Sequence, residues 1–148
     1  MLEADYYAVG VARMAEPKVV VAAGQKRIVE IKLSKHHRQN LVGLAVKITG
    51  HDQGWSSYPA DQGTYNNSWT WYTIKIGTSQ PETLWRNRHA VATPETQNKV
   101  WDRSSDVVSR LRGHGKLGIW AHARYPGWEN TVENASVELF FNPCGDLF

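Results

Sequence analysis

Residues 42–48 read VGLAVKI, and the alternation within this stretch decides the fold class. Every second residue is a large aliphatic one, namely Val42, Leu44, Val46 and Ile48, with Gly43, Ala45 and Lys47 between them. Successive side chains of an extended chain point to opposite sides, so this pattern predicts a strand with one buried and one exposed face.

The same period of two recurs before and after this stretch. Val29, Ile31 and Leu33 alternate with polar residues, and Val19 to Val21 form a shorter β-branched run. Downstream, one predicted strand directs Leu117, Ile119, Ala121 and Ala123 inward and places Lys116, Trp120, His122 and Arg124 on its other face. The last predicted strand directs inward Ala135, Val137, Leu139 and Phe141.

Helical periodicity is confined to residues 99–112, where Gly113 would end a helix, and this stretch suits a turn equally well. Many short strands separated by glycine and proline are typical of an all-β protein. We therefore predict one antiparallel β-sandwich domain over residues 1–148, of the jelly-roll kind, with long end loops and at most one short helix.

Composition narrows the classes of function. The chain has 148 residues, of which 41% are hydrophobic and 21% charged, as in soluble globular proteins. It has no apolar run of membrane-spanning length and no secretory-type N-terminus, so we expect a cytoplasmic protein without a membrane span. Cys144 is the single cysteine, which excludes an intrachain disulfide. The net charge of +3 is spread along the sequence, which does not favour nucleic acid as a partner.

Aromatic and polar residues gather in two segments. Residues 50–67 read GHDQGWSSYPADQGTYNN and follow a predicted strand, so they form a loop long enough to suggest a function. The next residues, SWTWYTIKI, predict a strand with Trp69 and Trp71 on one face and Tyr72, Ile74 and Ile76 on the other. Residues 122–130, HARYPGWEN, have a composition similar to that of the loop.

These two segments carry a resemblance to a known family. HDQGWSS at 51–57, GTY at 63–65, SWTW at 68–71, VWD at 100–102 and ARYPGWEN at 123–130 resemble the signature of a family of fungal proteins of unassigned function. The resemblance covers about residues 18–141. It implies a galactose-binding-like jelly roll, also similar to plant phloem lectins, and it implies no particular activity.

The residue types favour carbohydrate as the ligand. Sugar rings stack on flat aromatic side chains, and their paired hydroxyls bind planar polar groups. Loops from distant strands meet at one end of a jelly roll, so we expect the two segments to form one shallow site. Trp55 or Trp128 would provide the stacking surface and Arg124 a fork-shaped donor. The full set of predicted ligand-binding residues is His51, Asp52, Gln53, Trp55, Tyr58, Arg124, Trp128 and Asn130.

Other interpretations remain open at this stage. One alternative is a protein-interaction or structural module. In such a module the HDQGWSS loop has no ligand and serves to stabilise the sandwich, with Asp52 and Asp61 accepting backbone N–H bonds. A hydrolase would need a pair among the acidic residues Asp52, Asp61, Glu82, Glu95 and Asp102. The chain has none of the common nucleophile or P-loop motifs, so no enzyme activity is predicted.

No cofactor or metal is predicted. His51 and Asp52 are adjacent, and neighbouring side chains of an extended chain point apart, which disfavours joint metal binding. A calcium site at Asp52 or Asp61 would lack the EF-hand signature. The expected partner is a glycan or glycoconjugate bound weakly at each site, for which a homo-oligomer would supply avidity.

Overall fold

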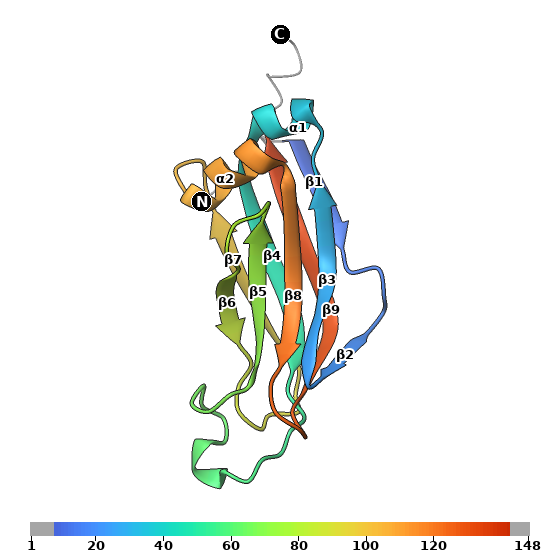
Figure 1. The fold of residues 1–148 in the computed structure, drawn as a ribbon, viewed down its shortest axis with the longest axis vertical. Helices are drawn as coiled ribbons and strands as arrows, with labels where there is room; N and C mark the ends of the chain where they lie inside the picture. Colours follow the sequence, from blue (N-terminus) through green and yellow to red (C-terminus); the bar gives the residue numbers. More distant parts are fainter. Residues whose placement is uncertain (1–7, 143–148) are drawn as a thin grey trace.

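Two antiparallel sheets face each other in the computed structural model, which describes residues 8–142 (Figure 1). Sheet I contains β1 (Ala8–Arg13), β2 (Val19–Ala22), β4 (Leu41–His51), β7 (Glu95–Trp101) and β9 (Glu129–Phe141). Sheet II contains β3 (Gly24–Lys32), β5 (Thr70–Ile76), β6 (Glu82–Arg86) and β8 (Lys116–Ala123). Cys144 lies outside the described residues.

The strand order confirms the jelly-roll prediction. Sheet I runs β1-β9-β4-β7, with β2 pairing to a further part of β9, and sheet II runs β3-β8-β5-β6. If β1 and β2 together count as the first strand, successive strands switch between the sheets as in a jelly roll, except that β5 and β6 pair with each other in sheet II. Every strand pair is antiparallel.

The aliphatic positions predicted from alternation form the core between the sheets. Leu44, Val46 and Ile48 of β4 are at most 1% exposed. Leu117, Ile119 and Ala121 of β8 are fully buried, and Tyr72, Ile74 and Ile76 are the inward face of β5. Trp69 and Trp71 are therefore on the outer side of sheet II, which resolves the alternative that the sequence left open.

The helical elements differ from the prediction. Residues 99–101 belong to β7, and the helix α2 (Asp106–His114) begins after the N-cap Ser105 and ends at Gly115, two residues beyond Gly113. Gly115 adopts the left-handed conformation that a glycine C-cap favours. A second short helix, α1 (Lys35–Asn40), lies outside the one stretch with helical periodicity, so the described chain has one α-helix more than predicted.

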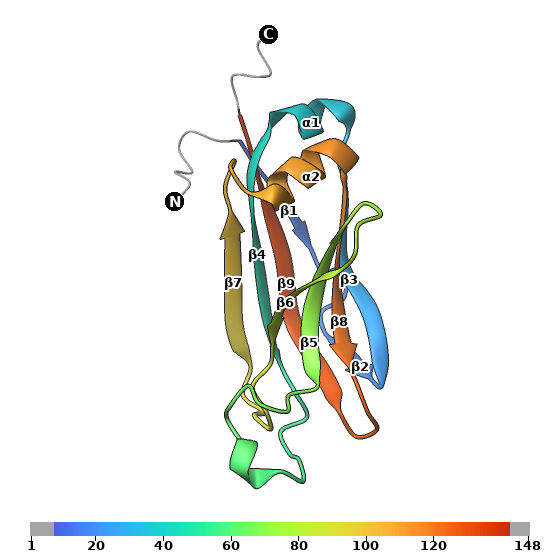
Figure 2. The ribbon, with the colours of Figure 1, turned by 60° about the vertical axis from the view of Figure 1, so that its left-hand side comes forward.

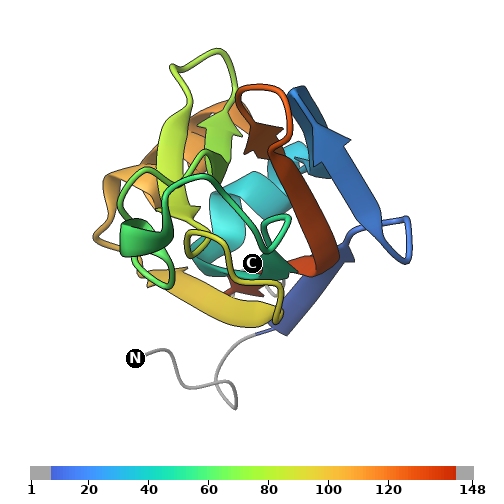
Figure 3. The ribbon, with the colours of Figure 1, turned by 90° about the horizontal axis from the view of Figure 1, so that it is seen from below.

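The helices and the long loops lie at opposite ends of the sandwich. Both helices cover one end, where Val107, Val108 and Leu111 of α2 enter the core (Figures 1 and 2). At the other end lie residues 52–69 with the short 3-10 helix η2 (Pro59–Asp61), residues 87–94 and the turn 124–128 (Figure 3). This second end is called the loop end below.

Candidate functional site

The loop of residues 52–69 is anchored by a buried carboxylate. Asp52 is 0% exposed, and its Oδ1 accepts hydrogen bonds from Gly54 N at 2.8 Å and Val91 N at 3.0 Å. Its Oδ2 accepts one from Ala90 N at 2.5 Å. Burial raises the pKa of Asp52 above its ordinary value, although the three backbone donors and nearby His89 act in the opposite direction. Asp52 thus connects its own loop to residues 87–94 by hydrogen bonds, which is a structural role.

A buried histidine makes the second connection between the same segments. His89 is 0% exposed, with Nε2 at 2.5 Å from Ser56 Oγ and Nδ1 at 2.9 Å from Asn67 O. Its ring meets the Trp128 ring edge to face, with centroids 5.2 Å apart. His89 therefore holds all three segments of the loop end together.

The turn between β8 and β9 contacts the long loop directly, so the predicted convergence of the two segments is confirmed. Gln53 Oε1 accepts a hydrogen bond from Glu129 N at 3.1 Å, while Gln53 Nε2 donates to Trp55 O at 2.6 Å. A Cβ atom on Gly127 would lie 3.2 Å from Cη2 of Trp55, and Gly127 has a φ of 88°. The glycine thus provides both the turn conformation and the room for the indole.

Beneath the loops, three polar side chains form a closed network inside the sandwich. The Tyr72 hydroxyl lies 3.0 Å from Asn87 Oδ1 and 3.1 Å from Asn130 Oδ1. Asn130 Oδ1 also accepts from Asn87 Nδ2 at 3.0 Å, and its Nδ2 donates to the Trp71 and His122 carbonyls. Asn130 is 0% exposed, so this predicted ligand residue faces the interior, as Asp52 does.

The outer surface of the loop end holds an aromatic groove of about 420 Å³, within the usual range for ligand sites. It is lined by Tyr58, Asn67, Trp69, Tyr125 and Trp128. Tyr58 is 58% exposed and Tyr125 is 47% exposed. The rings of Trp69 and Tyr125 meet at 86° with centroids 5.1 Å apart. We name this hollow the aromatic groove.

Polar groups lie on the rim of the aromatic groove. The Arg124 guanidinium lies 5.2 Å from the centroid of the Tyr125 ring, and Arg124 N donates to Trp69 O at 2.9 Å. Asn67 Nδ2 donates to Asp61 Oδ2 at 2.8 Å, which orients the amide. The groove thus presents aromatic rings and an amide, and the Arg124 guanidinium lies beside one of its lining residues, Tyr125.

Two of the groove residues have an unusual backbone conformation. Asn67 has a φ of 50° and Tyr125 a φ of 75°, a region that residues other than glycine seldom adopt. Asparagine tolerates this conformation, whereas for tyrosine it is strained. Strain of this kind is often found at functional sites, where the surrounding structure enforces it.

Of the eight predicted ligand residues, three are well placed for the aromatic groove. Tyr58 and Trp128 line it, and the Arg124 guanidinium lies against the ring of the lining residue Tyr125. Trp55 is 61% exposed and lies against the turn at Gly127, and Gln53 joins the two segments. Asp52 and Asn130 are buried supports.

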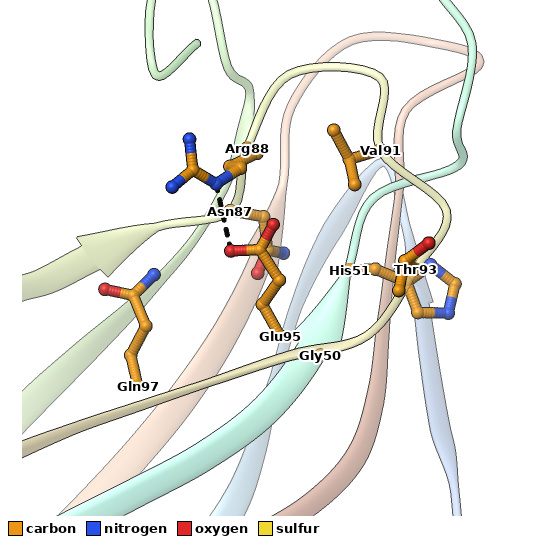
Figure 4. Close-up of a pocket in the computed structure, with 8 residues that line it drawn as sticks. All are labelled: Gly50, His51, Asn87, Arg88, Val91, Thr93, Glu95 and Gln97. Atoms are coloured by element: carbon orange, nitrogen blue, oxygen red, sulfur yellow. Dashed lines mark hydrogen bonds and ion pairs between the residues drawn. The ribbon is translucent and has the colours of Figure 1, made fainter. Parts of the chain in front are cut away.

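His51 lies apart from the groove, at the end of β4. Its Nε2 is 3.7 Å from Glu133 Oε1, while the neighbouring Asp52 carboxylate points to Ala90, so the two adjacent side chains diverge as expected. Figure 4 shows the hollow beside His51, which has a volume of about 10 Å³, enough for about one water molecule. Within it, Arg88 Nε donates to Glu95 Oε2 at 3.0 Å.

The five acidic residues considered for hydrolysis are dispersed in several local interactions. Glu82 pairs with Arg110 of α2 and Glu95 with Arg88. Asp102 accepts from the backbone and hydroxyl of Ser104. Asp52 is buried, and Asp61 accepts from Asn67. Within residues 8–142, no three His, Cys, Asp or Glu side chains are grouped as metal ligands would be.

Sequence reasoning did not single out Asn67, Trp69, Tyr125 or His89 as site residues. For Trp69, the sequence left open whether the face that it shares with Trp71 is buried or flanks the loop. Tyr125 lies inside the segment 122–130 already considered of interest. For His89, no sequence signal existed, because its contacts with residues 56, 67 and 128 are all distant in sequence.

The fold and the loop end together define an antiparallel jelly-roll sandwich with an open aromatic groove at one end. No family model matches the chain, and no curated protein matches it. Among solved structures, the chain is similar to one described as the structure of infectious bursal disease virus Gx strain, with a TM-score of 0.54 and 9% identity. That similarity covers 94% of this chain and 33% of the viral one, so this chain spans about a third of the viral chain's length.

A second similar structure is a family two carbohydrate esterase from Cellvibrio japonicus, with a TM-score of 0.35 and 8% identity. It covers 91% of this chain and 34% of the esterase. At 9% identity, the viral similarity supports the sandwich fold alone.

Proposed function

We propose that this protein is a non-catalytic carbohydrate-binding domain that holds its ligand in the aromatic groove. The observation that carries the proposal is the groove itself, in which Tyr58, Trp69, Tyr125 and Trp128 surround a hollow of about 420 Å³ at the loop end. Aromatic rings pack against the apolar faces of sugar rings, and the Asn67 amide and Arg124 guanidinium suit hydroxyl groups. The groove is supported by the buried residues Asp52 and His89, so it is formed before a ligand binds.

The lining residues also support a binding role over hydrolysis. None of the five side chains that line the groove carries a carboxyl group, whereas most glycosidases place two on either side of the scissile bond. A hydrolase mechanism would have to recruit acidic residues that are engaged elsewhere. The expected cytoplasmic location and the resemblance to the fungal family stay predictions.

An open groove of this size suggests modest affinity. It can cover about one or two sugar rings, so we expect a dissociation constant of about 10⁻³ to 10⁻⁴ M for each site. A glycan array on the purified protein would identify a ligand, and an NMR titration would then locate it. The amide signals that shift should belong to residues 58, 67–69 and 124–128.

Two tyrosines of the same loop offer a matched pair of variants. Tyr58 lines the groove, whereas Tyr65 is 44% exposed and packs against the Arg88 guanidinium, 4.9 Å from the ring centroid. Tyr58→Ala should abolish binding without lowering the melting temperature, and Tyr65→Ala should bind as the parent does. Arg124→Ala should also remove binding, while Lys35→Ala on α1 should not.

The competing interpretation is a protein-interaction or structural module whose loop stabilises the fold, favoured by the buried hydrogen bonds of Asp52 and His89. It would be supported by the absence of any hit across a broad glycan array. Equal binding by the Tyr58→Ala and Tyr65→Ala variants would also refute the placement of sugar in the groove.

A further inference from the structure

A second hollow lies on the outer face of sheet II, where residues of β3, β5 and β8 line it. It has a volume of about 220 Å³, and its lining includes Arg27, Glu30, Lys75, Lys116, Gly118 and Trp120. The β5–β8 pair joins both hollows, because Trp69 and Arg124 lie at one end of the pair and Lys75 and Lys116 near the other. Lys75 is six steps along the extended chain from Trp69, which corresponds to about 20 Å.

This outer face concentrates positive charge. The pairing register places five basic side chains on it, namely Arg27, Lys32, Lys75, Arg86 and Lys116. Within β3, β5, β6 and β8, which are all described, Glu30 is the one acidic side chain on this outer face. The other acidic residue, Glu82, pairs with inward-facing Ile74 and bonds to Arg110. The whole chain has a net charge of +3, so the rest of the molecule is slightly acidic.

Three of these charges, Lys75, Arg86 and Lys116, have no ion-pair partner among the described residues, although Arg86 Nη1 donates to Ser68 O at 2.6 Å. Arg27 Nη2 lies 2.7 Å from Glu30 Oε2, and Lys32 Nζ lies 3.7 Å from Glu30 Oε1, so Glu30 serves both. Lys75 and Lys116 make no ion pair within residues 8–142, and both line the second hollow. The hollow therefore attracts anions, and it does so beside the indole of Trp120.

On the surface between the two hollows, the aromatic ring of Trp71 is covered by its neighbours and is not available for stacking with a ligand. Trp71 lies between His122 on β8 and Arg86 on β6, stacked on the imidazole with centroids 4.8 Å apart. The Arg86 guanidinium is 5.9 Å from the Trp71 centroid and 5.7 Å from that of Trp69. Nucleobases need exposed ring faces for stacking. Because both faces of Trp71 are flanked, an anionic sugar chain suits this surface better than single-stranded nucleic acid.

We propose that the ligand is an acidic sugar chain, whose carboxylate or sulfate groups bind Lys75 and Lys116 in the second hollow while a sugar ring stacks in the aromatic groove. This inference rests on the proposed function and specifies its ligand class. Its physical basis is charge complementarity along one face, with the two hollows as the ends of a single binding track.

Matched pairs of ligands test the charge requirement. The probes are an oligogalacturonide and its methyl ester, and a heparin-derived oligosaccharide and its desulfated form, titrated into the full chain by calorimetry. The acidic member of at least one pair should bind more tightly than its neutral counterpart. Salt should weaken that preference, since the screening length falls from about 30 Å at 0.01 M to about 10 Å at 0.1 M.

Charge-neutral variants locate the effect. Lys75→Gln with Lys116→Gln should lower affinity for the acidic ligand about fivefold to thirtyfold, as expected for two exposed charge contacts. The control is Lys35→Gln with Lys47→Gln, which changes the net charge equally but alters α1 and the other sheet. The control should retain the full preference for the acidic ligand.

The outcomes separate the two proposals. Binding of neutral and acidic members with equal affinity would overturn the inference and leave sugar binding in the aromatic groove intact. If both double variants lost the preference for the acidic ligand, that preference would depend on net charge alone. This result would overturn the placement of the acidic groups in the second hollow. Tighter binding of oligo(dT) than of every sugar, with competition at this face, would show that nucleic acid is the occupant.

Discussion

Asp52 shows how a long polar loop can be held without disulfides. Its carboxylate accepts three backbone N–H groups from two segments and is shielded from solvent. Asp61, the other aspartate of the loop, instead accepts from one side-chain amide of Asn67. One interpretation of the sequence had both aspartates accepting backbone N–H groups, and the structure shows such bonds for the Asp52 carboxylate alone.

Asp52→Ala should lower the free energy of unfolding by roughly 3 kcal/mol, because buried backbone donors would lose their acceptor. Asp61→Ala removes an exposed contact and should lower it by less than about 1 kcal/mol. Urea denaturation of both variants checks the difference. Equal losses would show that the loop does not depend on the buried carboxylate.

His122 makes the stability sensitive to acid. Burial lowers the pKa of His122 below its ordinary value of 6.5, and its Nε2 lies 2.8 Å from Thr73 Oγ1. The unfolded chain takes up a proton at this histidine as the pH falls through about 6.5, while the folded chain resists it. The contribution of His122 to stability is therefore full above pH 6.5 and is lost as the pH falls below that value.

The His122→Gln variant should show a smaller loss of stability than the parent between pH 7 and pH 5. Glutamine retains a hydrogen-bonding group near Thr73 but has no titrating group in this range. Denaturation midpoints at several pH values measure the effect. An identical pH dependence in parent and variant would assign the acid sensitivity to other groups.

At the scale of secondary structure, alternation predicted strands well and helices poorly. The inward residues of β4 and β8 were identified because each sheet has one buried face, whereas for β5 alternation separated two faces without showing which one is buried. Residues 99–101 were grouped with a helix because Val100 happens to match its spacing, whereas pairing of β7 with β4 determines their actual conformation. The helix α1 buries no residue, so it has no apolar pattern that a sequence could reveal.

Ile119→Ala should lower the stability by roughly 2–5 kcal/mol, since Ile119 is fully buried in the centre of sheet II. Val20→Ala is the control, because Val20 is 53% exposed and should change stability by less than about 0.5 kcal/mol. Thermal and chemical denaturation of the two variants would measure the contrast. A small effect at Ile119 would contradict the assigned facing of β8.

At the scale of the whole molecule, the helices close one end and the loops build a site at the other. The convergence of residues 52–69 with 124–128 was predictable from the jelly-roll fold. The groove itself was not, because its shape depends on which aromatic residues pack inward, and that depends on contacts such as those of His89. Two predicted ligand residues, Asp52 and Asn130, proved to be buried for the same reason.

If each groove binds sugar weakly, linking two copies should increase apparent affinity for a dense glycan surface by about 10²–10⁴ without changing the affinity of one site. A tandem fusion with a flexible linker, compared with the single domain by surface binding, tests this expectation. A tandem fusion with Tyr58→Ala in one copy should behave as a single domain. An unchanged apparent affinity of the unmodified tandem would mean that the copies cannot engage together.

The polar network of Tyr72, Asn87 and Asn130 has a consequence for how the chain folds. These side chains come from β5, the segment after β6, and β9, and every buried side-chain nitrogen and oxygen within residues 8–142 has a hydrogen-bond partner. If β9 or β5 slipped by two residues during folding, the same face would stay inward but these atoms would be buried without partners, at a penalty of about 1–3 kcal/mol each. A purely apolar interior would tolerate such slips far better. We expect this network to destabilise incorrect strand registers, so that the native register of the two sheets is selected before the loop end forms.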